Sequence, residues 1–375
     1  MLLKNSVSIL LALCIASAAS AGEVMIGSIV GLTGPNASTS AEGTKILTGY
    51  VDMINDKGGI NGNRLNHVIK DDQYDPAKTA ALAEEVITKD GAVALINAVG
   101  TANAMALMKT GVLTRHKVPL IGVFSGADVI RGPGSEQIFH TRASYSDEIM
   151  KISRLASTLG LKRIAVLYQD GGFGASIMQS INKASGEYQL EVMHKEPYTA
   201  GETDFAPHAR RVIAAKPQAI FLMGVPEAVI RFMTAYNAPA AASQIYSLSF
   251  VPVKMLVAIA GEQKVRGMGI SQVVPNPDSA VISLAKDFQA FLKSPYGAGV
   301  QSNTVNFEVY LNVRLVAEAI RLAGPKPTPE KVTRALMSMN NVELGGYPIS
   351  FSETARRGSQ YLDIAVIGRN GRLNY

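Results

Sequence analysis

Two short loops carry the residue types best suited to hold an anion. Gly100-Thr101-Ala102 and Phe124-Ser125-Gly126 each combine a hydroxyl group with small neighbours that leave the backbone N–H groups accessible. Each loop follows an apolar run, and residues 103–115 between them have a helical pattern. Such a βαβ unit presents both loops at the carboxyl edge of a parallel sheet, where a helix N-terminus favours an anion. We therefore expect this edge to bind a small ligand through its carboxylate.

The other reactive residues match no catalytic motif. The five histidines are scattered, without the HExxH or HxxxH spacing of a zinc site. Ser125 lacks the G-x-S-x-G context of a nucleophile elbow, and no triad partners follow it in order. The glycines of residues 31–34 and 171–174 lack the spacing of phosphate- or dinucleotide-binding loops. We expect the protein not to be an enzyme and to need no cofactor or metal.

One acidic run has two interpretations. Asp71, Asp72 and Asp75 match a DDxxD pattern that could hold a divalent metal through carboxylates. The same run predicts a helix start, because Asp75 suits an N-cap and Pro76 suits the first helical position. Since no second acidic cluster completes a metal site, we favour the helix start and expect a helix over residues 77–89.

Three aromatic residues stand at strand ends or in loops, outside any periodic run. These are Tyr145, Phe173 and Phe250. Each one taken alone is typical of local packing. Because all three fall at the expected edge of a lobe, the alternative is that one or more of them stack on a ligand.

The amino terminus has the pattern of a secretory signal peptide. Lys4 supplies a positive charge, residues 7–16 are apolar, and Ala19-Ser20-Ala21 is an A-x-A cleavage site. We expect cleavage after Ala21, which removes Cys14, the only cysteine. The mature chain would then have no disulfide and no thiolate metal site, and we expect it to be soluble beyond the inner membrane.

The net charge of +6 does not indicate nucleic-acid binding. The basic residues occur as isolated doublets such as Lys162-Arg163 and Arg356-Arg357, with no basic run interleaved with aromatic residues. A nucleic-acid interface usually gathers such residues on one face. The charge is typical of solvated helix surfaces.

Apolar strand patterns alternate with amphipathic helical patterns along the chain. Besides the βαβ unit, we expect strands over residues 24–30, 64–70, 137–141, 163–168, 190–196, 219–223, 244–249, 265–274 and 361–366. We expect further helices over residues 40–55, 146–159, 204–215, 226–236, 279–292, 304–322 and 329–339. This alternation is typical of an α/β fold with parallel sheets. Residues 163–242 repeat the element order of residues 24–115, so we expect two similar α/β lobes. We also expect the chain to pass between these lobes more than once.

Several motifs along the mature chain resemble those of one protein family. They are Asn55-x-x-Gly58-Gly59-Ile60-Asn61-Gly62, Asp71-Asp72, Asp75-Pro76, Phe139-His140-Thr141-Arg142, Tyr168-Gln169-Asp170-Gly171-Gly172-Phe173-Gly174 and Gln272-Val273-Val274-Pro275. Together they resemble the type I periplasmic solute-binding proteins of ABC importers, in the branched-chain amino acid (leucine/isoleucine/valine-binding protein) family.

The resemblance implies two Rossmann-like lobes with parallel-sheet cores, joined by a three-crossover hinge and closing on a ligand. We expect residues 1–21 to be the signal peptide. Lobe 1 is then expected to contain residues 22–143 and 273–346, and lobe 2 residues 144–272 and 347–375.

The resemblance also assigns roles to residues of the site. The loops at Gly100-Thr101-Ala102 and Phe124-Ser125-Gly126 would hold the ligand's carboxylate, while Phe173 covers the ligand and Tyr145 faces the cleft from the crossover. Amino-acid-binding members place an acidic residue in lobe 2 for the ammonium group, but residues 247–250 here contain none. Either the ligand lacks an amino group, or Asp147 or Glu227 replaces that residue.

The expected function is that of a periplasmic, monomeric receptor for a small organic ligand, docking transiently on an ABC permease of the inner membrane. The alternative is a soluble ligand-sensing co-receptor of a signalling system. A cleavable signal without a trailing membrane helix argues against a receptor fused to its own membrane domain.

Overall fold

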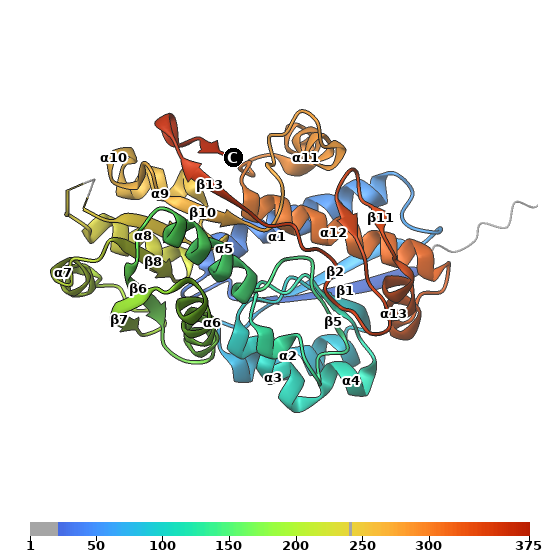
Figure 1. The fold of residues 1–375 in the computed structure, drawn as a ribbon. Helices are drawn as coiled ribbons and strands as arrows, with labels where there is room; N and C mark the ends of the chain where they lie inside the picture. Colours follow the sequence, from blue (N-terminus) through green and yellow to red (C-terminus); the bar gives the residue numbers. More distant parts are fainter. Residues whose placement is uncertain (1–21, 240–241) are drawn as a thin grey trace, which may run out of the picture.

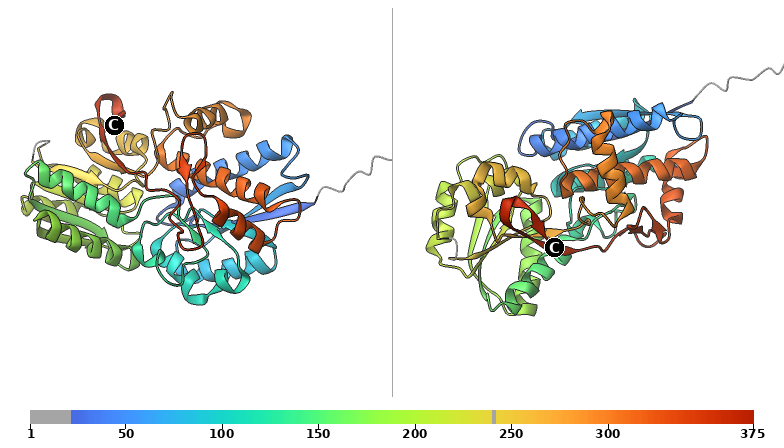
Figure 2. Two further views of the ribbon diagram at one scale, coloured as in Figure 1. Left: turned by 45° about the vertical axis from the view of Figure 1, so that its right-hand side comes forward. Right: turned by 90° about the horizontal axis from the view of Figure 1, so that it is seen from above.

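Two lobes, each built on one β-sheet, make up the protein, and the chain passes between them three times (Figures 1 and 2). The computed structural model describes residues 22–239 and 242–375. The expected signal peptide, residues 1–21, lies outside these described residues. Within the described part of the chain, no helix has both the length and the apolar composition needed to span a bilayer.

Lobe 1 contains a five-stranded sheet in which all the neighbouring strands are parallel. Its strands, in spatial order, are β2 (Arg64–Asp71), β1 (Glu23–Val30), β3 (Ala92–Ile96), β4 (Leu120–Ile121) and β5 (Ile138–Phe139). One face carries α2 (Pro76–Thr88), α3 (Thr101–Thr110) and α4 (Val112–His116), and the other carries α1 (Ala37–Asp56), α12 (Thr304–Ala323) and α13 (Pro329–Ser338) (Figure 1). Shorter or flanking elements of this lobe are η1 (Asp128–Ile130), α11 (Ser283–Lys293), η2 (Pro295–Gly297) and the hairpin of β11 (Val342–Glu343) and β12 (Pro348–Ile349).

Lobe 2 contains a seven-stranded sheet that is parallel except at one edge, where β10, β13 and β14 pair antiparallel. The spatial order of its strands is β14 (Leu373–Asn374), β13 (Asp363–Ile367), β10 (Gly269–Gln272), β9 (Gln244–Ser247), β8 (Ala219–Met223), β6 (Arg163–Gln169) and β7 (Glu191–Tyr198). The helical elements are α5 (Tyr145–Thr158), α6 (Gly172–Tyr188), α7 (Ala206–Ala214), α8 (Pro226–Ala235), α9 (Val253–Ala260), α10 (Glu262–Val265) and η3 (Arg369–Gly371). The predicted α/β fold with two parallel-sheet lobes is therefore confirmed.

The three connections between the lobes run from β5 to α5, from β10 to α11 and from β12 to β13. The predicted lobe boundaries after residues 143 and 272 fall within the first two connections, and they stay predictions. The expected third boundary, between residues 346 and 347, falls inside the hairpin in which Val342 pairs with Ile349. Beyond it, the Phe351 ring still packs against Phe139 of lobe 1, with the ring centroids 5.2 Å apart. We therefore propose that lobe 1 extends through the hairpin, and that the chain crosses between Phe351 and β13.

Three elements differ from the prediction, two of them because of the backbone conformation of a glycine. The expected helix over residues 103–115 begins earlier and divides into α3 and α4 at Gly111, whose φ of +66° ends a helix. The expected strand over residues 265–274 contains the end of α10 and a turn at Gly267, where φ is +85°, so only β10 remains extended. Helix α9 was not predicted, because Lys254 is its only polar residue and a period of polar and apolar residues is therefore hard to recognise in its sequence.

The acidic run at the end of β2 begins a helix, as predicted. Asp75 caps α2 by accepting a hydrogen bond from the Ala77 backbone N–H at 2.8 Å, with Pro76 in the first helical position. Asp71 instead accepts from the Thr33 hydroxyl at 2.7 Å, and Asp72 accepts from the Thr79 hydroxyl at 2.6 Å. The three carboxylates thus serve different partners, and no group of metal-ligating residues gathers in the described chain.

Replacing Asp75, the N-cap of α2, should lower the stability of the protein, and this effect should not depend on metal ions. We predict that Asp75→Ala reduces the free energy of unfolding by about 1 kcal/mol, because the Ala77 N–H loses its acceptor. Asp75→Asn retains an acceptor and serves as the control in urea denaturation. If calcium or magnesium stabilised the wild-type protein but not Asp75→Ala, the metal interpretation of this run would replace ours.

Candidate functional site

The two predicted anion-binding loops lie side by side at the carboxyl edge of the lobe 1 sheet. Val99 and Phe124 form a parallel β-bridge, and the Gly100 N–H donates to the Phe124 carbonyl at 3.3 Å. Immediately beyond this bridge, the hydroxyl groups of Thr101 and Ser125 share a hydrogen bond of 2.8 Å. Since α3 begins at Thr101, the N-terminus of a ten-residue helix points to the same place. The predicted βαβ geometry is confirmed.

A cavity opens from this edge toward lobe 2. Its empty volume is about 780 Å³ when the part open to solvent is included. Six of the nine residues predicted for the site line it: Gly100, Thr101, Phe124, Tyr145, Phe173 and Phe250. Walls from both lobes contribute, as in sites that enclose most of a small ligand.

The other three predicted residues lie behind the cavity wall. Ser125 is fully buried, with its oxygen held between the Thr101 hydroxyl and the Ala127 N–H, so it supports Thr101 and has no exposed surface of its own. A Cβ atom on Gly126 would lie 2.5 Å from the Tyr145 ring, which explains why a glycine is needed there. Ala102 faces Gly172 of lobe 2, where the two lobes touch.

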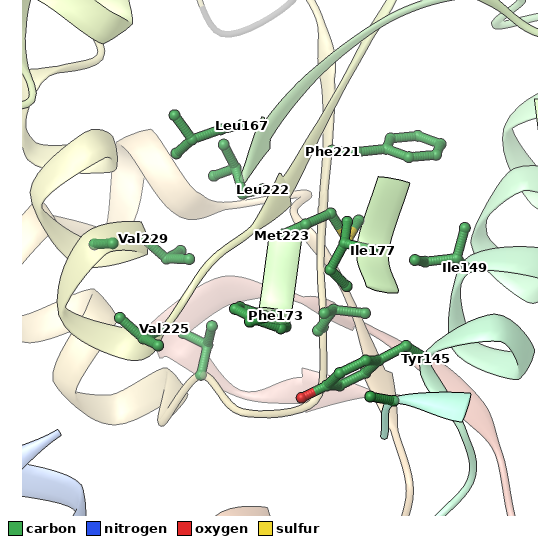
Figure 3. Close-up of a cluster of buried hydrophobic side chains, with 14 of the residues drawn as sticks. Tyr145, Ile149, Leu167, Phe173, Ile177, Phe221, Leu222, Met223, Val225 and Val229 are labelled. Atoms are coloured by element: carbon green, nitrogen blue, oxygen red, sulfur yellow. The ribbon is translucent and has the colours of Figure 1, made fainter. Parts of the chain in front are cut away.

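The three predicted aromatic residues meet at one side of the cavity. The centroid of the Tyr145 ring lies 5.3 Å from that of Phe173 and 5.7 Å from that of Phe250, and the Phe173 and Phe250 centroids are 6.4 Å apart. Figure 3 shows Tyr145, Phe173 and Val225 at the border of the apolar core of lobe 2. The rings pack on one another, as the packing interpretation predicts, and they also line the cavity, where stacking on a ligand stays a prediction.

The sequence analysis missed polar residues of lobe 1 that line the cavity opposite the three aromatic rings. Asn36, Thr39 and Tyr74 line the cavity from the loops and helix that follow β1 and β2. The amide nitrogen of Asn36 and the hydroxyl oxygen of Thr39 are buried without a hydrogen-bond partner. Burial raises the pKa of Tyr74 to about 12, so its hydroxyl stays protonated and can donate. The signal was present, since the turn after the first strand must share the carboxyl edge with the other two loops.

Beneath the aromatic residues, a buried ionic cluster joins the lobes at the hinge. The Arg142 guanidinium is inaccessible to solvent and lies 3.7 Å from Glu308 of lobe 1 and 3.7 Å from Glu148 of lobe 2. It donates a hydrogen bond to the Ser249 hydroxyl of lobe 2. Its centre is also 4.2 Å from the centroid of the Phe250 ring, a cation–π contact. One side chain on the first connection thus contacts both lobes.

Glu308 is the weakly held member of this cluster. The separation of 3.7 Å from Arg142 is too long for a hydrogen bond, and the Glu308 Oε1 atom has no hydrogen-bond partner. Burial raises the pKa of Glu308 to about 7, although the charge of Arg142 opposes the rise. By contrast, Glu148 accepts hydrogen bonds from the Ser249 N–H at 3.1 Å and from the Ser271 hydroxyl.

The two carboxylates considered as substitutes for an ammonium-binding residue have different surroundings. Asp147 belongs to the capping box of α5, where it accepts from the Ser144 N–H at 3.0 Å and hydroxyl at 2.7 Å. Glu227 reaches across the cleft, and its Oε1 accepts from the Ser38 hydroxyl of lobe 1 at 2.6 Å. Its Oε2 is buried without a partner, and burial raises the pKa of this carboxyl group. Neither residue is among those that line the cavity.

Comparison with known proteins agrees with the two-lobed architecture. A model of the family described as periplasmic binding protein matches residues 23–372. The chain belongs to this family. Leu/Ile/Val-binding protein homolog 3 of Brucella melitensis is 22% identical over 376 residues, covering 96% of each protein. The leucine-, isoleucine-, valine-, threonine-, and alanine-binding protein of Pseudomonas aeruginosa is 26% identical over 305 residues, covering 81% of this chain and 79% of that protein.

Among solved structures, a substrate-binding periplasmic protein from Ralstonia solanacearum is similar to this chain over nearly its full length. The two share 32% sequence identity and superpose with a TM-score of 0.88, covering 93% of this chain and 99% of that one. The resemblance predicted from the motifs is therefore confirmed, and the periplasmic binding protein fold extends across the described lobes.

The hydroxyl group of Thr101 should contribute directly to ligand binding in this periplasmic binding protein. We predict that Thr101→Val, which keeps the shape, weakens affinity for the ligand about tenfold or more, because a hydrogen bond to a charged group is lost. Thr110→Val, at the exposed end of the same helix, is the control. Ser125→Ala should weaken binding less, since Ser125 acts through Thr101. Calorimetry measures the affinities, and equal affinity in wild type and Thr101→Val would exclude the loop site.

Glu308 should make the stability of the protein depend on pH. The folded state keeps the proton of a carboxyl group whose pKa is raised, so between pH 4.5 and about 7 unfolding releases that proton. The stability that Glu308 contributes is complete below pH 4.5 and is lost as pH rises toward 7. The free energy of unfolding should therefore decline between pH 4.5 and about 7. We predict that Glu308→Gln makes this decline smaller by up to about 3 kcal/mol.

Denaturant unfolding at several pH values tests this prediction, with Glu318→Gln as the control. Glu318 lies on the same helix but pairs with Arg321 at the partly exposed surface. The difference in unfolding free energy between wild type and Glu308→Gln should change with pH, whereas that of the control should not. A constant difference would show that Glu308 is ionised throughout this range.

Proposed function

We propose that this periplasmic binding protein is the receptor of an ABC importer, which captures a small carboxylate-bearing solute and delivers it to a permease in the inner membrane. We further propose that it acts in the periplasm after removal of residues 1–21, as a monomer, and that it releases its ligand chemically unchanged. The nine residues predicted from the sequence remain our proposed ligand site, with Ser125, Gly126 and Ala102 acting from behind the wall.

The observation that carries this proposal is the cavity at the carboxyl edge of the lobe 1 sheet, closed on its other side by lobe 2. Ligands of open α/β sheets bind at that edge. Here the edge supplies the N-terminus of α3, the Thr101 hydroxyl and the unpartnered Asn36 amide nitrogen, all of which suit an anion. A ligand enclosed on both sides is almost completely removed from water, so a few hydrogen bonds suffice for selectivity.

The connections between the lobes suit opening and closing. Away from the hinge, the lobes meet through small contacts: the Ser38–Glu227 hydrogen bond of 2.6 Å and the approach of Ala102 to Gly172. Such contacts can separate at modest cost, whereas the buried Arg142 cluster joins the lobes at the hinge. The architecture supports hinge closure around a solute, and the name of the Pseudomonas aeruginosa relative, which refers to amino acid binding, is consistent with a small carboxylate.

The mature chain should be stabilised and compacted by its ligand. We predict that, in a library of small carboxylates, the ligand raises the unfolding temperature, since it binds only the folded state, and lowers the radius of gyration in X-ray scattering. Mass spectrometry of the recovered ligand should show an unchanged mass, and a changed mass would favour an enzyme.

Deleting the gene in the organism that carries it separates transport from sensing. If the protein serves an importer, uptake of the radiolabelled ligand should fall, and a gene copy with Thr101→Val should restore it poorly. If uptake were unchanged while a response to the ligand disappeared, the protein would be a sensory co-receptor. Wild-type complementation controls for effects of the deletion on neighbouring genes.

A further inference from the structure

The wall of the cavity contains no charged side chain among the described residues. Lobe 1 contributes neutral hydroxyl and amide groups, including those of Asn36, Thr39 and Thr101. The wall on the lobe 2 side is formed by the aromatic residues Tyr145, Phe173 and Phe250 together with two aliphatic residues, Val225 and Pro226. Lobe 1 also contributes apolar side chains, such as Val30, Leu47 and Val305. Apart from the Tyr145 hydroxyl, the polar side chains of the cavity therefore all come from lobe 1, and the lobe 2 side is apolar.

A ligand ammonium group would lack a charged partner in this cavity. Burying an unpaired charge is costly, and the closed cleft offers little water to offset that cost. The nearby buried carboxylates have other roles: Asp72 accepts hydrogen bonds from Thr79 and Asn103, and Glu148 and Glu308 flank Arg142 at the hinge. Ser249 does not replace them, because it is not among the residues that line the cavity and its hydroxyl accepts a hydrogen bond from Arg142.

A ligand carboxylate, by contrast, would find hydrogen-bond donors already in place. Asn36 occupies the N-cap position of α1, yet its side chain makes no capping hydrogen bond, unlike Asp75, Ser144 and Asn303 at other helices. Only 4% of the residue is exposed, and its amide nitrogen has no partner while it lines the cavity. Together with the N-terminus of α3 and the Thr101 hydroxyl, this donor suits an oxyanion.

The apolar side matches the remainder of such a ligand. The rings of Tyr145, Phe173 and Phe250 are inclined to one another by 53° to 81°, as in tilted and edge-to-face packing. Such an arrangement accepts a further ring or a branched aliphatic group at low cost.

Building on the proposed receptor function, we propose that the ligand is a carboxylic acid without an amino group, with a ring-sized apolar body. Its carboxylate faces Asn36, Thr101 and the N-terminus of α3, and its body packs against the aromatic residues of the lobe 2 side. Glu227 does not hold the ligand, and its carboxylate connects the lobes through Ser38.

Matched pairs of compounds that differ only in the amino group test the ligand class directly. We predict that phenylpropanoate binds at least 100-fold more tightly than phenylalanine, and isocaproate more tightly than leucine, because only the amine-bearing member buries an unpaired ammonium group. Isothermal titration calorimetry of the wild-type mature chain measures all four. Equal or tighter binding of the amino acid in both pairs would overturn the proposal.

Two isosteric variants locate the carboxylate. Asn36→Asp replaces the unpartnered donor by a negative charge and should weaken binding of the preferred acid roughly 100-fold, while an aspartate at this N-cap position leaves helix α1 stable. Glu227→Gln should leave the preference for the amine-free acid in place. Unchanged acid binding by Asn36→Asp, or a loss of amino acid binding in Glu227→Gln, would contradict the assignment.

Failure of this inference differs from failure of the receptor function. If an amino acid or an uncharged solute closes the lobes and its uptake depends on the gene, the ligand class is wrong and the receptor function stands. If phenylpropanoate or isocaproate binds tightly but gene deletion leaves its uptake unchanged, the ligand class stands and the importer assignment is wrong.

Discussion

One buried guanidinium between the lobes constrains much of this structure. The Arg142 guanidinium has no access to solvent, so its charge must be balanced inside the protein. Lobe 1 supplies Glu308, and lobe 2 supplies Glu148 and Ser249, so the partners lie on both sides of the hinge. The ring centroids of Phe250 and Phe124, which line the cavity, lie 4.2 and 5.9 Å from the guanidinium. The hinge and the floor of the site are thus built from the same side chains.

Much of the fold follows from local sequence patterns. Strand β8 has the predicted limits, and α2 begins at the predicted cap, because burial periodicity and N-cap chemistry act over a few residues. Predictions were less accurate where the backbone conformation of one residue decides the outcome, as at Gly111 and Gly267. Our proposal for the third lobe connection rests on interactions of a different kind: the β11–β12 hairpin, and the contact of Phe351 with Phe139, which is far away in the chain.

In the candidate site, too, some features follow from the sequence pattern and others depend on contacts between residues far apart in the chain. Parallel-sheet topology was enough to bring Thr101 and Ser125 together, since both follow neighbouring strands. The sequence could not show that Ser125 is buried behind Thr101, because Tyr145 and Ala127 close around that loop only in the folded chain. It also could not show that Asn36, a typical capping residue, leaves its amide nitrogen free toward the cavity. These orientations depend on tertiary packing.

In the importer proposed above, the Ser38–Glu227 hydrogen bond would have a consequence for signalling to the permease. Both of its groups belong to the protein, so it favours closure whether or not a solute is present. A stronger bond would increase the fraction of empty receptors that already have the closed shape, because populations follow the free-energy difference between the two states. Such empty, closed receptors would occupy permeases without delivering cargo. In such an importer, the strength of this one contact would set a compromise between retention of the solute and occupancy of the transporter by empty receptors.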